Sequence, residues 1–113
     1  MSAVMQKSAT REIPKIRQSA RGENCTMEGP MCNFNPETTV WCHSDYSEHG
    51  RGFGFKTHDI FGYFGCFGCN SWFDEHSKRT GSKFYVEPQE RRWYYQRAHD
   101  RSLVRLLEKG VLK

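Results

Sequence analysis

The sequence predicts a small α+β domain with an additional C-terminal helix, and three observations support this fold class. Two short runs of β-branched and aromatic residues, 38–41 and 60–64, are typical of strands. Residues 88–109 carry a long amphipathic pattern, which is typical of a helix. Two cysteine pairs bracket the region that contains the strands: Cys25 with Cys32, and Cys66 with Cys69. With 113 residues, of which 36% are hydrophobic, the chain is long enough for one small domain.

The four paired cysteines are predicted to bind one structural zinc ion. Four thiolates at about 2.3 Å from one Zn²⁺ make a closed tetrahedral site, and such a site contributes directly to folding. A core this small commonly needs that supplement. The second pair has the more specific spacing, because Cys25 and Cys32 are further apart than in most zinc knuckles. Disulfides or free thiols are the alternative.

Cysteine usage also bears on the compartment. The chain has five cysteines, no signal-peptide pattern and no apolar run of about 18 residues. An odd cysteine count together with a Cys-x-x-Cys motif favours metal binding in a reducing compartment over disulfides. We therefore expect a cytoplasmic protein that makes no contact with a membrane.

The net charge of +4, with a pI near 8.9, suits an anionic partner without requiring one. Residues 1–21 contain five basic side chains and one acidic one, and they are predicted to form a partly disordered, solvated tail. The alternative is a basic arm on a nucleic-acid backbone. Within this tail, residues 13–16 are expected to be extended, because Pro14 disfavours helix at Ile13. The domain itself is expected at 22–113.

The first predicted strand delivers Cys42 and His43 at its end. A glycine-rich loop follows over 44–56, and its Gly-x-Gly-x-Gly run lacks the strand–helix frame of a dinucleotide site. No nucleotide cofactor is therefore expected. The second strand leads into the Cys66–Cys69 knuckle, which precedes a predicted helix from about 70 to 77.

The long helix is expected to run over 88–109, with Pro88 in its first turn and Gly110 as a left-handed cap. Its predicted buried stripe consists of Tyr95, Ala98, Ser102, Leu103 and Leu106. Arginines four residues apart form a basic edge on the same helix: Arg97, Arg101 and Arg105. That edge either contacts nucleic-acid phosphates or is simply solvated.

A strand ending in histidine, a hairpin, a Cys-x-x-Cys knuckle and a helix follow one another in this chain. The residues that make up the pattern are Ala20-Arg21-Gly22-x-x-Cys25, Cys32-x-Phe34-x-Pro36-Glu37-Thr38, His43, Lys56-x-His58-Asp59 and Cys66-x-x-Cys69. In them the chain resembles the HNH endonuclease superfamily, specifically the small YbcO-like prophage nucleases, over roughly residues 16–113. The resemblance implies a treble-clef, ββα-metal fold and a divalent-metal phosphodiesterase of phage or prophage origin.

By this resemblance His43 is the general base, since an imidazole with a pKa near 6.5 can deprotonate water near neutral pH. Its alternative role is a structural histidine or a further zinc ligand. Asp59 either orients the base or ligates the catalytic Mg²⁺ or Mn²⁺. Asn70 is either a ligand of that ion or a helix cap. Asp74 and His76, about one turn further on, are expected to complete the metal shell.

Cys42 departs from the family pattern, in which a carboxylate often precedes the base, and we expect it to be a buried thiol. Arg51 and Lys56 in the glycine-rich loop are expected to hold flanking phosphates, together with Arg97 and Arg101. Alternatively, the glycines serve only to let the loop turn. Three further polar residues receive no catalytic role: Asp45, His49 and His99, the last expected to be a core histidine.

The favoured function is a metal-dependent endonuclease that hydrolyses phosphodiester bonds in DNA. The alternative is a non-catalytic zinc module that binds nucleic acid or a protein partner. That alternative explains the positive net charge, but it gives His43, Asp59 and Asn70 no shared chemical role. A thiol redox protein is a third hypothesis, because Cys-x-x-Cys occurs there too. The sequence leaves open whether the protein is a monomer or a homodimer.

Overall fold

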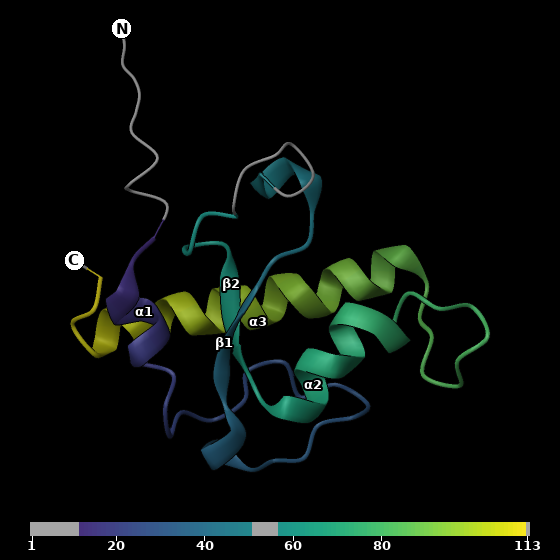
Figure 1. The fold of residues 1–113 in the computed structure, drawn as a ribbon, viewed down its shortest axis with the longest axis horizontal. Coiled ribbons are helices and arrows are strands. Elements are labelled where there is room, and N and C mark those ends of the chain that lie inside the picture. The colour runs from purple at the N-terminus through teal and green to yellow at the C-terminus, as the bar shows by residue number, and fades with distance from the viewer. Residues whose placement is uncertain (1–11, 51–56, 113) are drawn as a thin grey trace, which may run out of the picture.

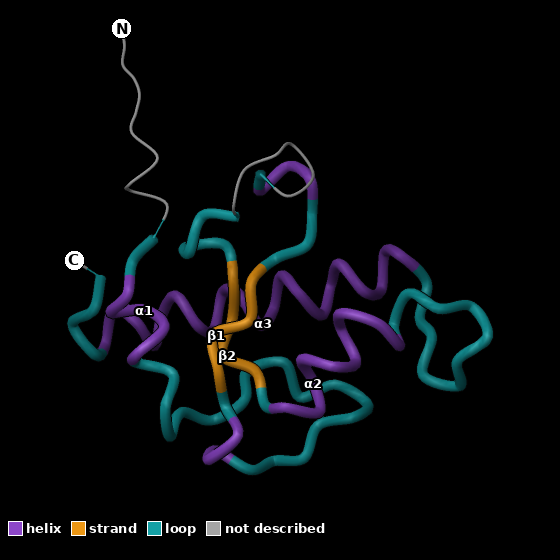
Figure 2. Tube along the Cα trace, viewed as in Figure 1, coloured by secondary structure: helices purple, strands orange, loops and turns teal. Residues whose placement is uncertain are grey.

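Two antiparallel strands lie at the centre of the fold, with helices around them (Figure 1, Figure 2). The computed structural model describes residues 12–50 and 57–112. The elements follow in the order α1 (Pro14–Gln18), η3 (Pro36–Thr38), β1 (Val40–His43), η4 (Ser47–His49), β2 (Gly62–Gly65), α2 (Phe67–Ser71), η5 (Trp72–His76) and α3 (Pro88–Glu108). Of these, η3 and η4 are 3-10 turns and η5 is a π-helix. The predicted α+β class with a C-terminal helix is confirmed.

The hairpin of β1 and β2 separates two hydrophobic clusters. Its register runs from Val40 opposite Gly65 to His43 opposite Gly62, so side chains alternate between two faces. Cys42 lies in a cluster with Met27, Tyr63, Cys66, Cys69, Trp72, Phe73, Tyr95 and Ala98. The other cluster contains Trp41, Phe64, Ile16, Ala20 and Leu106. The long helix α3 supplies residues to both clusters, and it therefore braces the hairpin along its length.

The predicted bounds of α3 agree with the structure to one residue, and Gly110 has the expected positive φ of 77°. Four of the five predicted stripe residues are buried: Tyr95, Ala98, Ser102 and Leu106. Ser102 anchors the helix to the hairpin, because its hydroxyl accepts a hydrogen bond from the Phe64 amide at 2.9 Å and donates one to the Ala98 carbonyl at 2.8 Å. The hydroxyl of this buried polar residue therefore both accepts and donates a hydrogen bond.

The segment before residue 22 differs from expectation. Residues 14–18 form helix α1 instead of an extended piece of a solvated tail, and Ile16 and Ala20 are buried. Pro14 occupies the first helical turn, where its missing N–H is not needed, and Ile13 before it stays outside the helix. The sequence signal that could have indicated a packed helix, and that was missed, is the apolar pair Ile16 and Ala20, four residues apart. Residues 1–11 lie outside the described residues.

The helix after the second knuckle begins earlier than predicted. Cys66 is the N-cap of α2, and its sulfur accepts a hydrogen bond from the Cys69 amide at 3.3 Å. From Trp72 the chain continues as the π-helix η5, in which the Ser77 amide donates to the Trp72 carbonyl at 2.7 Å. Because the Ser77 amide bonds to Trp72, five residues earlier, it does not bond to the Phe73 carbonyl. That carbonyl accepts hydrogen bonds from side chains instead. None of the helices within 12–50 and 57–112 has the length and apolar character of a membrane span.

Gly68 provides a test of the packing between α2 and the first knuckle. A Cβ added there would lie 2.0 Å from the Met31 carbonyl oxygen. We expect Gly68→Ala to destabilise the protein by about 1–3 kcal/mol in urea unfolding, because this overlap outweighs the gain in helix propensity. Gly81→Ala is the matched control, since a Cβ there meets nothing within 4 Å. Equal stability of the two variants would contradict this packing.

Candidate functional site

The four paired cysteines come together in one cluster. Their Sγ atoms all lie within 4.8 Å of one another, and those of Cys32 and Cys66 are 3.7 Å apart. A tetrahedral zinc site with bonds of about 2.3 Å has sulfur–sulfur edges of about 3.8 Å, so the cluster fits a metal such as zinc. Cys42 lies outside it as a buried thiol, as predicted. Because Cys66 and Cys69 share the cluster with the first pair, the arrangement disfavours a two-cysteine redox site.

Backbone amides donate to the cluster sulfurs and join the two knuckles. The Gly29 amide of the first knuckle donates to Cys69 at 3.3 Å, and the Asn33 amide donates to Cys66 at 3.4 Å. Within the first knuckle, the Glu28 amide lies 3.5 Å from Cys25. Such donors orient sulfur ligands and stabilise their charge. The wide spacing between Cys25 and Cys32 is thus accommodated by a turn whose amides face the same four sulfurs.

The pKa values in the cluster show why four thiolates require a cation. A hydrogen bond from Cys69 lowers the pKa of the Cys25 thiol to about 5, although burial opposes the change. The same interaction, followed by burial, raises the pKa of Cys69. Burial also raises the pKa of Cys32 to about 12. Cys25 is therefore easily ionised while Cys32 and Cys69 hold their protons, and a bound metal ion would release those protons.

His43 forms a direct pair with Asp59. The Nε2 atom of His43 lies 2.6 Å from Oδ1 of Asp59, and the aspartate is buried whereas the side chain of His43 is 35% exposed. The pair is placed by two elements: His43 ends β1, and Asp59 precedes β2. Trp41 holds the backbone of Asp59 in place, because its indole Nε1 donates to the Asp59 carbonyl at 2.6 Å. We call His43 and Asp59 the dyad.

The surroundings of Asp59 keep its carboxylate ionised. Burial raises the pKa of Asp59, but the hydrogen bonds from His43 and the Ile13 amide, together with Arg17, lower it further, so that the net shift is downward. The Ile13 amide donates to Oδ2 at 2.5 Å, and Arg17 Nε lies 3.6 Å from the same oxygen. Both carboxylate oxygens are therefore engaged.

An ionised carboxylate can only accept hydrogen bonds, so the proton of the neutral His43 ring lies on Nε2. The other ring nitrogen, Nδ1, then carries a lone pair. Within the described part of the chain, no hydrogen bond uses this nitrogen. The dyad can thus take a proton from a water molecule at Nδ1 while Asp59 holds the ring in this tautomer.

Asn70, Asp74 and His76 lie on the α2–η5 segment, which packs against the face of the hairpin that bears Cys42. Asn70 is not the helix cap, since Cys66 takes that position. Burial raises the pKa of Cys42 and the nearby Asp74 carboxylate adds to the rise, which places Asp74 on this side. Nδ1 of His76 accepts a hydrogen bond from the Arg79 guanidinium at 3.3 Å. The contacts of the described residues join His43 to Asp59, but none joins this pair to Asn70 or His76.

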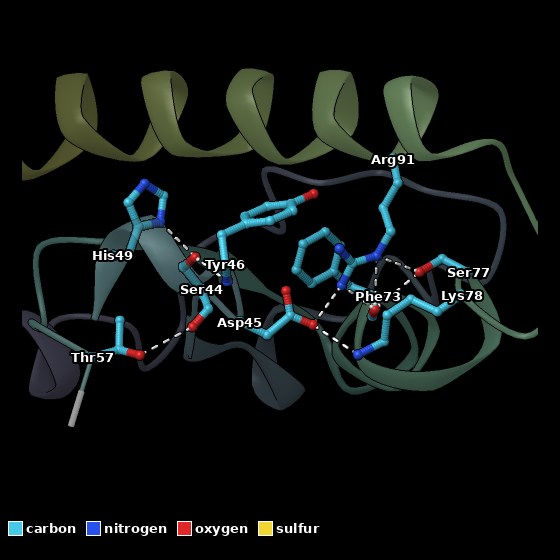
Figure 3. A network of polar contacts seen from close by, with 9 residues as sticks. All are labelled: Ser44, Asp45, Tyr46, His49, Thr57, Phe73, Ser77, Lys78 and Arg91. Atoms are coloured by element: carbon cyan, nitrogen blue, oxygen red, sulfur yellow. Dashed lines mark hydrogen bonds and ion pairs between the residues drawn. The ribbon is translucent and has the colours of Figure 1, made fainter. Parts of the chain in front are cut away.

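A buried ionic network, which sequence reasoning missed, anchors the loop that follows His43 (Figure 3). Asp45 Oδ2 accepts from Arg91 at 2.7 Å and from Lys78 at 2.9 Å. Burial raises the pKa of Asp45, but these two cations lower it by more. Arg91 also donates to the Phe73 carbonyl at 2.8 Å and, through Nε, to the Ser77 hydroxyl, also at 2.8 Å. The carbonyl released by the π-helix is thus the acceptor that fixes Arg91.

Hydrogen bonds also connect the segments on either side of the glycine-rich loop. Ser44 Oγ lies 2.6 Å from His49 Nδ1 and accepts from the Tyr46 amide at 3.0 Å. The Thr57 hydroxyl donates to the Ser44 carbonyl at 3.2 Å. Arg51 and Lys56, which were predicted to hold phosphates, lie outside the described residues. His99 donates a hydrogen bond from Nδ1 to the Gly62 carbonyl at 2.8 Å, as expected of a core histidine.

The arginines of the basic edge contact the first knuckle and the segment before it. Arg97 donates to the Met27 carbonyl at 2.7 Å, and Arg101 pairs with Glu28 at 3.2 Å. Arg105 pairs with Glu23 at 2.9 Å. The edge is therefore not merely solvated: it holds the segment that contains Cys25 against α3. A contact of Arg97 or Arg101 with nucleic acid stays a prediction.

Comparisons with known proteins agree with this arrangement. A family model described as "Putative nuclease YbcO" matches residues 14–111. A solved structure described as a putative bacteriophage protein from Escherichia coli str. K-12 substr. MG1655 is similar at 26% identity, with a TM-score of 0.63. The similarity covers 85% of this chain and 100% of that one. No protein among those with curated descriptions matches the chain.

The sulfur cluster predicts one zinc ion per chain. We expect elemental analysis of the purified protein to find about one equivalent, and Cys69→Ser to lose it and unfold at lower temperature, because three thiolates hold the ion less well. Cys42→Ser is the matched control, since this buried cysteine lies outside the cluster. Retention of the full zinc equivalent by Cys69→Ser would contradict the assignment.

The network around Arg91 predicts that replacing this arginine destabilises the protein much more than replacing its neighbour, Arg92. Arg91→Met leaves the buried Asp45 carboxylate and the Phe73 carbonyl without their main donor, and we expect a loss of about 3 kcal/mol or more in urea unfolding. Arg92→Met is the matched control, because Arg92 forms an exposed pair with Glu48 and its loss should change stability little. Similar losses in both variants would contradict the assigned role of the network.

Proposed function

This chain belongs to the YbcO putative-nuclease family, and we propose that it hydrolyses phosphodiester bonds in DNA with His43 as the general base. The observation that carries the proposal is the 2.6 Å contact between His43 Nε2 and an ionised, buried Asp59. The family description and the similar bacteriophage protein support a phage-associated nuclease. The order of β1, loop, β2 and α2, with a histidine at the end of β1, supports an HNH-type, treble-clef site as the finer assignment.

In the proposed mechanism, Nδ1 of His43 removes a proton from a water molecule. The water oxygen then forms a bond to phosphorus as the bond from phosphorus to the leaving sugar oxygen breaks. Asp59 holds the Nε2 proton and stabilises the imidazolium that forms, as an aspartate does beside other catalytic histidines. Of the two roles considered for Asp59, we propose this orienting one, because Ile13, Arg17 and His43 already engage both of its oxygens.

A divalent cation such as Mg²⁺ or Mn²⁺ would supply electrostatic stabilisation of the phosphate and of the leaving oxygen. We propose Asn70, Asp74 and His76 as its ligands, and the amide and carboxylate oxygens among them suit a hard cation. Asn70 is partly buried and Asp74 is exposed, so at least the carboxylate can be reached from solvent.

The alternative function is a zinc-containing module that binds nucleic acid or a protein partner without cleaving. The sulfur cluster and the net charge of +4 are compatible with it. In that case the dyad would be a structural contact between β1 and the segment that precedes β2.

A plasmid-nicking assay distinguishes the two functions. We expect nicking that depends on Mg²⁺ or Mn²⁺, and we expect His43→Ala to reduce its rate at least about 100-fold, because a general base contributes about 10²–10⁴-fold. Asp59→Asn should also reduce the rate, since an amide no longer keeps the proton on Nε2. The zinc content of His43→Ala should equal that of the parent, and the variant should remain folded at the assay temperature.

His58→Asn is the matched control, because the asparagine oxygen can replace His58 Nδ1 as the acceptor for the Ile60 amide. This variant should nick at the parental rate. If His43→Ala retains full activity, His43 is not the base. A gel shift without cleavage under any divalent ion would favour the binding module.

A further inference from the structure

A cleft of about 730 Å³ opens between α1 and the segment from η3 to β1. Figure 1 shows α1 beside this part of the hairpin. One wall comes from α1 and the turn after it, including Arg17 and Arg21, and the other wall includes Thr39, Val40 and Trp41. The role of this cleft is not explained by the sulfur cluster, which lies at the opposite face of the hairpin.

Two lining residues of the cleft contact Asp59, although neither His43 nor Asp59 itself lines the cleft. Arg17 contacts Asp59 through Nε at 3.6 Å, and Trp41 holds the Asp59 carbonyl through its indole nitrogen. A group bound in the cleft therefore lies next to the residues that position His43. The side chain of Arg17 is 47% exposed although its Nε lies beside Asp59, so its guanidinium can also contact an anion in the cleft.

The arginines that line the cleft have fewer acidic partners than the arginines of α3. Arg91, Arg101 and Arg105 of α3 each pair with a carboxylate. Arg21 forms no ion pair with any residue that the structure describes, and it is exposed. Since Arg17 is also 47% exposed, two arginines of the cleft lining face solvent, and the lining contains a single acidic residue, Glu37. This arrangement attracts an anion.

Thr39 is a second and independent indication of a ligand. The residue is only 5% exposed, and its hydroxyl is buried without a hydrogen-bond partner among the described residues. A buried hydroxyl without a partner costs roughly 1–3 kcal/mol, so its presence calls for an explanation. Because Thr39 also lines the cleft, a ligand bound there is the candidate partner for this hydroxyl.

We infer that this cleft binds a phosphate of the nucleic-acid backbone next to the phosphate that His43 attacks. The ligand chemistry is that of a phosphodiester: Arg17 and Arg21 supply charge-assisted donors, and Thr39 supplies a neutral one. The inference rests on the proposed nuclease function and specifies how its substrate is held. Arg17 would then be shared between Asp59 and the substrate, so the backbone is positioned by the same side chain that supports the dyad.

Binding of a short fluorescein-labelled DNA duplex, followed by anisotropy in the non-cleaving His43→Ala background, tests the inference. Arg21→Gln should weaken binding about 5- to 10-fold and reduce the slope of log K against log[salt] by about 0.9, the value for one lost phosphate contact. Arg79→Gln removes the same charge near the far end of η5 and is the matched control; it should change the affinity less than 2-fold, about the effect of net charge alone. Equal effects of the two variants would overturn the inference.

Thr39→Val separates ligand binding from a structural role. Removal of an unpartnered hydroxyl should leave the melting temperature unchanged or raise it, while DNA affinity falls. A lower melting temperature with unchanged affinity would overturn the assignment of Thr39 to the ligand site. With His43 present, Arg21→Gln should raise KM for nicking and leave kcat unchanged. If His43→Ala still nicks DNA, the proposed base fails, whereas the anisotropy result still reports on the cleft.

Discussion

The sulfur cluster is the constraint on which the rest of the structure depends. It joins a loop between α1 and η3 to the junction of β2 and α2, and amides from each knuckle donate to the sulfurs. Because four sulfurs within 4.8 Å repel one another once they are ionised, a metal ion such as zinc bound among them would stabilise this junction. The position of β2 follows from the cluster, and the register places His43 at the opposite end of the hairpin, beside Gly62.

The hairpin divides the molecule into two functional sides. Cys42 and His43 are adjacent in the chain, but alternation along β1 directs the thiol into the aromatic cluster around Tyr63 and the imidazole toward Asp59. The first side carries the sulfur cluster and the α2–η5 segment. The second side carries the dyad, α1 and the proposed phosphate cleft. A strand of four residues therefore directs two adjacent side chains, Cys42 and His43, into different surroundings.

Arginine residues serve two different purposes in this fold. Along α3 they are committed to intramolecular contacts: Arg91 to the Asp45 network, and Arg97, Arg101 and Arg105 to the segment from Glu23 to Glu28. Those contacts fasten the helix to the loop after His43 and to the first knuckle. The arginines of α1 and the turn after it have fewer partners, and they lie where the substrate backbone is proposed to pass. The net charge of +4 alone does not reveal this division.

Local patterns in the sequence determined the two strands, the limits of α3 with its glycine cap, the pairing of the four cysteines in one cluster and the buried state of Cys42, because propensity, periodicity and ligand spacing act over a few residues. Only the tertiary structure decided that 14–18 is a packed helix, that Asp59 rather than Asn70 contacts His43, and that Asp45 is bound by Arg91. The Ile13–Asp59 and Asp45–Arg91 contacts each span 46 residues. Partners so far apart in the chain meet only through the packing of whole elements, and no local pattern records that packing.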